Sequence, residues 1–126
     1  MHDVIKKLKF KDSGVIINAP AAMEGEFKKL NFKTAFDKKT KSANTLIFVN
    51  NNGEFLAYLK NELKSIEPDS VLWFAYPKGT SKIKTDINRD SLRETAEGYG
   101  ITTVAAISID DTWSALRFLP IEKVGK

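Results

Sequence analysis

The chain has 126 residues, of which 42% are hydrophobic and 29% are charged; this is the composition of one ordinary globular domain, not of a disordered chain. It contains no cysteine and a single histidine, His2, which excludes disulfides, cysteine–metal sites and Ser–His–Asp catalysis. The net charge of +4 is concentrated in residues 1–41, which hold ten lysines against five acids.

The first half of the chain predicts two short buried strands separated by a helix. Residues 4–8 place three apolar side chains on one face of a short helix, and the β-branched run 15–18 predicts the first strand. A helix is expected at residues 21–30, after Pro20, and a short edge strand at residues 32–36. Residues 45–50 predict the second buried strand, and the three asparagines at its end suit the cap of the strongly amphipathic helix that follows.

The second half is organised around residues 71–77, an unbroken run of apolar and aromatic side chains. Such a run predicts a strand buried on both faces in the middle of a sheet, and Pro77 should end its pairing. A helix is expected next, with Ser91 and Glu94 at capping-box spacing and with Asn88 and Asp90 as alternative caps. Residues 101–109 and 113–119 predict an antiparallel hairpin.

This alternation of strands and helices predicts one α/β domain spanning residues 1–126. We expect a three-layer, mostly parallel, Rossmann-like sheet, with the strands at 15–18, 45–50 and 71–77 side by side and the C-terminal antiparallel hairpin closing it. Every apolar run is far shorter than a bilayer requires, so we expect a cytoplasmic protein with no membrane partner.

A ligand site is expected at the carboxyl ends of the parallel strands, where open α/β sheets bind their ligands. Amides, hydroxyls and charged groups collect there, and the candidate residues are Asn18, Asn50, Asn51, Tyr76, Lys78, Thr80 and Asp86. The structural alternative is that the asparagines and Asp86 cap helices and turns. The favoured function is a non-catalytic binding domain for a small anionic ligand or a protein partner.

Two other functions remain open from the sequence. The first is an enzyme that uses Lys78 with Asp86 or Asp110 as acid or base. The second is nucleic-acid binding through Lys6–Lys11 and Lys38–Lys41, although the nearby phenylalanines have spacings that fit a core, so a solvated lysine face is favoured. No G-x-G-x-x-G or P-loop motif is present, so we expect no cofactor, and we assign no catalytic or metal-binding residue.

Three segments carry a resemblance to a known family. They are W-F-A-Y-P-K-G-T-S at residues 73–81, T-D-I-N-R-D at residues 85–90 and D-D-T-W-S-A-L-R-F at residues 110–118, with N-A-P at residues 18–20. In these motifs the chain resembles a family of small, uncharacterised bacterial proteins, and the resemblance implies no activity. At the level of the fold the chain is also similar to class I methyltransferases without their cofactor glycine motif.

Overall fold

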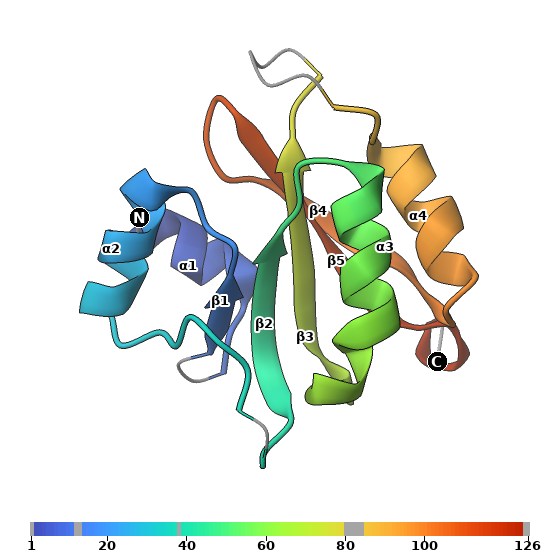
Figure 1. The fold of residues 1–126 in the computed structure, drawn as a ribbon, viewed down its shortest axis with the longest axis horizontal. Coiled ribbons are helices and arrows are strands. Elements are labelled where there is room, and N and C mark those ends of the chain that lie inside the picture. Colours follow the sequence, from blue (N-terminus) through green and yellow to red (C-terminus); the bar gives the residue numbers. More distant parts are fainter. Residues whose placement is uncertain (1, 12–13, 38, 80–84, 125–126) are drawn as a thin grey trace.

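The computed structural model describes residues 2–11, 14–37, 39–79 and 85–124. The helices in this part of the chain are α1 (His2–Leu8), α2 (Ala21–Lys29), α3 (Asn52–Asn61) and α4 (Arg89–Glu97), with 3-10 turns η1 (Leu63–Ser65) and η2 (Ile121–Lys123). The strands are β1 (Val15–Ile17), β2 (Ser42–Phe48), β3 (Ile66–Pro77), β4 (Ile101–Ser108) and β5 (Trp113–Pro120). Their arrangement is shown in Figure 1.

The described strands form one open mixed sheet in the order β1-β2-β3-β5-β4. The pairs β1–β2 and β2–β3 are parallel, whereas β3–β5 and β4–β5 are antiparallel. The prediction of a mostly parallel, Rossmann-like sheet is therefore wrong. The physical reason is that the hairpin inserts β5 directly beside β3, so that half of the strand pairings become antiparallel and β4 is left as an open edge. The expected adjacency of the first three strands is confirmed.

β3 occupies the centre of the sheet because both of its faces are apolar. Residues 71–75 of this strand are all buried, at 5% exposure or less. Its side chains alternate between two hydrophobic clusters, so that Leu72 and Phe74 face one layer and Trp73 faces the other. Phe74 packs edge to face against Phe55 of α3 and Phe118 of β5, with ring centroids 4.8 and 5.5 Å away.

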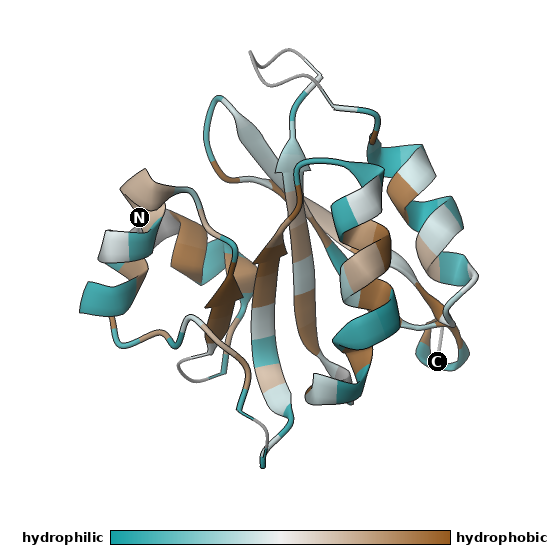
Figure 2. Ribbon diagram, in the orientation of Figure 1, coloured by the Kyte–Doolittle hydropathy of each residue, from teal (hydrophilic) through white to brown (hydrophobic). Residues whose placement is uncertain are grey.

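The two clusters lie on opposite faces of the sheet and each is covered by a pair of helices. Phe55 of α3 and Leu92 of α4 belong to the first cluster, while Leu8 of α1 and Phe27 of α2 belong to the second. Figure 2 shows both hydrophobic and hydrophilic residues on the helices, as expected for helices with one side on the core. No helix among the described residues is long and apolar enough to cross a membrane.

Local signals in the sequence explain where the main helices begin and end. The side chain of Asn51 caps α3 by accepting the N–H of Glu54. α4 begins at a capping box formed by Asn88 and Ser91, so that Asn88 is the cap among the alternatives left open by the sequence. After α4 the chain turns into β4 through Gly100, whose φ of 86° suits glycine.

Candidate functional site

At the carboxyl edge of the parallel strands, Asn18 and Asn50 both donate hydrogen bonds to the carboxylate of Glu54. The Nδ2 atom of Asn18 donates to Glu54 Oε1 at 3.2 Å and to the carbonyl of Phe48 at 2.9 Å. The backbone N–H and the Nδ2 atom of Asn50 donate to the same Oε1 atom at 3.0 and 3.2 Å. These amide donors are therefore bonded within the chain and hold β1, β2 and α3 together.

Asn51 and Asp86 lie around the N-terminus of α3. Asn51 Oδ1 accepts the N–H of Glu54 at 2.9 Å, and Asp86 Oδ1 accepts the N–H of Asn52 at 2.8 Å. The adjacent Thr85 hydroxyl donates to the carbonyl of Asn50 at 2.7 Å. Both candidate residues thus satisfy backbone donors that the first turn of a helix leaves without partners, which is a capping role.

The side chains of Tyr76 and Lys78 contact the C-terminal hairpin and not the start of α3. Lys78 Nζ donates to the hydroxyl of Ser108 at 2.7 Å, and Tyr76 lies opposite Ser114 of β5. Burial raises the pKa of the Tyr76 phenol above its ordinary value, and the positive charge of Arg89 and a hydrogen bond with Ser114 act in the opposite direction. The remaining candidate, Thr80, lies outside the described residues.

The acid–base pairing of Lys78 gains no support from the contacts. Asp110 Oδ1 accepts the backbone N–H groups of Thr112 and Trp113, both at 2.8 Å, and so holds the hairpin turn. Asp86 caps α3, as described above. No group of three His, Cys, Asp or Glu residues in the described part of the chain could hold a metal ion.

The described lysines of residues 1–41 are all exposed. Lys6 and Lys7 are exposed in the last turn of α1, and Lys38 lies outside the described residues. Phe10 and Phe32 contact each other at a centroid distance of 5.9 Å; Phe32 is buried in the second hydrophobic cluster and the partly buried Phe10 packs against it. These two rings pack in the core, whereas single-strand binders present aromatic rings for base stacking.

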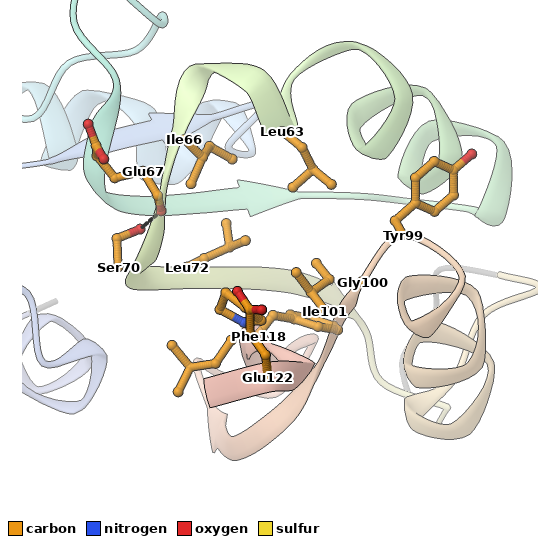
Figure 3. Close-up of a pocket in the computed structure, with 12 residues that line it drawn as sticks. Leu63, Ile66, Glu67, Ser70, Leu72, Tyr99, Gly100, Ile101, Phe118 and Glu122 are labelled. Carbon is orange, nitrogen blue, oxygen red and sulfur yellow. Dashed lines mark hydrogen bonds between the residues drawn. The ribbon is translucent and has the colours of Figure 1, made fainter. Parts of the chain in front are cut away.

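A pocket of about 240 Å³ opens at the opposite, amino-terminal end of β3 (Figure 3). Its floor is formed by the paired residues Leu72 and Phe118, whose side chains also belong to the first core cluster. Its walls include Leu63 of η1 and Ile101 at the start of β4. None of the six described candidates from the sequence lines it, nor any of three further pockets.

The polar groups of this pocket are few. The lining residues with polar side chains are Glu67, Ser70, Tyr99 and Glu122. The hydroxyl of Ser70 donates to the carbonyl of Glu67 at 2.6 Å, and Figure 3 shows the Glu67 carboxylate directed away from the other lining residues. Lysine and arginine are absent from the residues that line it. Sequence reasoning missed this site because its walls come from three separate segments, residues 63–72, 99–101 and 118–122, and no motif indicates that they meet.

Comparisons of the chain with protein-family models, with curated proteins and with solved structures gave no match. The resemblances in the motifs at residues 73–90 and 110–118 stay predictions. Candidate functions therefore depend on the geometry of the chain itself, and the pocket in Figure 3 and the polar carboxyl edge are the two places to compare.

Proposed function

We propose that the protein is a non-catalytic binding domain and that the pocket in Figure 3 takes a compact small molecule with an apolar body. The supporting observation is that core side chains, Leu72 and Phe118, form the floor of a surface pocket with few polar groups. Such a combination is the usual form of a small-molecule site. Binding of an anion at the carboxyl edge has less support, because the amides and carboxylates there are bonded to one another.

The charges of the pocket decide which ligands it favours. Glu67 and Glu122 are the charged residues of the lining, which contains no lysine or arginine, so we expect the pocket to favour a cation over an anion. A ligand with an apolar ring and an amine suits it better than the same ring with a carboxylate. This ligand class replaces the small anionic ligand expected from the sequence.

The volume limits the ligand size and the affinity. At about 240 Å³ the pocket is smaller than the ~300–1,000 Å³ that is usual for drug-sized ligands. Benzylamine, with about eight non-hydrogen atoms, is a suitable probe; at about 0.5 kcal/mol per atom it would bind with about 4 kcal/mol. That corresponds to a Kd of about 1 mM, which NMR titration measures directly.

The experiment compares benzylamine, benzyl alcohol and benzoate, which share one ring and differ in charge. We expect affinity to fall in that order. Glu122→Lys should weaken benzylamine and strengthen benzoate by about threefold, the scale of an exposed ion pair. The control Glu26→Lys changes the net charge by the same amount as Glu122→Lys, but at an exposed position of α2, and should leave the order of the three affinities unchanged. Equal binding of all three compounds, or tightest binding of benzoate, contradicts the proposal.

A further inference from the structure

The outer edge of β4 is open along the described part of the chain. β4 pairs with β5 on one side and is the last strand of the sheet. Three consecutive residues in its middle, 104–106, are exposed, and Val104 is one of few large hydrophobic residues on the surface, at 38% exposure. An unpaired edge presents a row of backbone donors and acceptors to any strand that approaches.

The opposite edge of the sheet, at β1, is partly covered by another segment of the chain. β1 has three residues, and its outer side is occupied by Lys33, which accepts the N–H of Ile16 at 2.8 Å and donates to the carbonyl of Gly14 at 3.0 Å. β4 is eight residues long and contains no charged residue and no proline, which are the residues that commonly protect an edge. Its one protective feature is a register shift between Thr103 and Ala105.

The register identifies which N–H groups of β4 point outward. The N–H of Ile109 donates to the carbonyl of Trp113, so it points toward the β5 side of the hairpin. Direction alternates along a strand, and the pairing is regular from Ala105 to Ser108. The N–H groups of Ala106 and Ser108 therefore point away from β5, toward a strand that would add at this edge.

Beside this edge, α4 and β4 enclose a groove of about 400 Å³ whose charges indicate the kind of partner. It is lined by Arg89, Asp90 and Arg93 of α4, by Thr103, Val104 and Ala105 of β4 and by Leu116 of β5, so two cations face one carboxylate among the charged residues of the lining. Arg93 is 3.6 Å from Asp90, whereas Arg89 makes no ion pair with any described residue. The N-terminus of α4 adds partial positive charge at the same end of the groove.

We propose that β4 takes an extended, acidic segment of a partner protein as an added strand, with its carboxylates against Arg89 and Arg93. Main-chain hydrogen bonds to Ala106 and Ser108 would supply affinity, and the arginines would select acidic side chains. The same edge could pair with a second copy of this chain. A two-fold axis near the middle of β4 would bring the arginines of the two copies together, so their repulsion favours an acidic partner.

The test starts from a phage-displayed library of random octapeptides selected on the intact chain. We expect enrichment of sequences that are acidic, poor in proline and rich in β-branched residues. The best peptide is then synthesised and its Kd is measured by fluorescence anisotropy. Ala106→Pro removes one outward N–H and should weaken binding at least tenfold, whereas Ala106→Ser keeps that N–H and should change the Kd less than twofold.

The charge requirement is tested with a double variant, Arg89→Ala with Arg93→Ala. It should weaken the peptide at least threefold, and Lys6→Ala with Lys7→Ala, which removes two exposed cations from α1, should not. Amide hydrogen exchange of the unmodified chain provides a readout without any substitution, because bound peptide should protect Ala106 and Ser108 specifically.

Three results would overturn this proposal. They are no enrichment of acidic peptides, equal binding to the Ala106→Pro variant with no protection of β4 amides, and a dimer in analytical ultracentrifugation that Ala106→Pro dissociates. The last result would assign the edge to a second copy of the chain. The outcome is independent of the pocket in Figure 3, which lies at the amino-terminal end of β3.

Discussion

Removal of the Glu54 carboxylate distinguishes a structural carboxyl edge from a ligand site. Glu54 Oε1 accepts hydrogen bonds from Asn18 Nδ2, from the backbone N–H of Asn50 and from Asn50 Nδ2. Glu54→Ala removes the acceptor of these three bonds, and Asn18 Nδ2 keeps only its bond to the carbonyl of Phe48. The Asn18 bond joins residues 36 positions apart, whereas the two Asn50 bonds are local to the start of α3. Loss of the Asn18 bond should therefore destabilise the domain beyond α3.

The magnitude follows from the bonds and their exposure. Hydrogen bonds to a charged group are each worth about 1.5–3 kcal/mol when buried, and less where water replaces the lost acceptor. The Asn18 contact is exposed and the two Asn50 contacts are partly buried, so we expect a total loss of about 2 kcal/mol. For a domain of this size 1 kcal/mol corresponds to about 4 °C, so Tm should fall by about 8 °C.

The assay is thermal unfolding by circular dichroism at pH 7, with urea unfolding as a second measure. Glu26→Ala is the matched control, because Glu26 is an exposed glutamate of α2 without a described side-chain bond, and its Tm should stay within about 1 °C. A Tm for Glu54→Ala as close to the wild type as that of the control would refute the structural role. Asn18 and Asn50 would then again be candidates for ligand binding.

Three further perturbations follow from the packing. Trp73→Phe removes the indole Nε1 donor that lies 2.8 Å from the carbonyl of Leu8, and the unpaired carbonyl should cost about 1–3 kcal/mol and speed hydrogen exchange in α1. Gly14→Ala places a methyl group against the backbone of Asn44, so we expect a loss of about 1–3 kcal/mol in urea unfolding. Burial raises the pKa of Tyr76 in the folded chain, so the contribution of its neutral phenol to stability is complete below about pH 10 and is lost at higher pH. In Tm measurements from pH 8 to 12, Tyr76→Phe should therefore show a smaller fall in Tm with pH than the wild type.

The central strand was predictable because a strand buried on both faces has an unbroken run of apolar residues. Residues 71–77 are apolar throughout, and the strand they form is at the centre of the sheet. Its true start at Ile66 was missed, since Pro68 and Asp69 indicated a break. The periodicity of the sequence did not show whether the strand beside β3 is parallel or antiparallel to it, because either arm of the hairpin can pair with β3. β5 is the inner arm, and it carries the bulky apolar residues Trp113, Leu116 and Phe118, which are buried there.

The candidate site was only partly predictable, for a physical reason. Parallel strands end at one edge, so Asn18 and Asn50 meet there as expected. Their shared acceptor, Glu54, was missed although Asn51 and Glu54 have capping-box spacing, which is a signal that a short sequence window contains. The pocket in Figure 3 depends on how three distant segments pack, and such contacts leave no local pattern.

The location of bound ligand tests the central claim of this account most directly. With benzylamine at a concentration near its Kd, we predict intermolecular nuclear Overhauser effects from the ring protons to the methyl groups of Leu63, Leu72 and Ile101. Overhauser effects to Asn18 and Asn50 instead, with none to these methyl groups, would place the binding site at the carboxyl edge of the sheet and contradict the account.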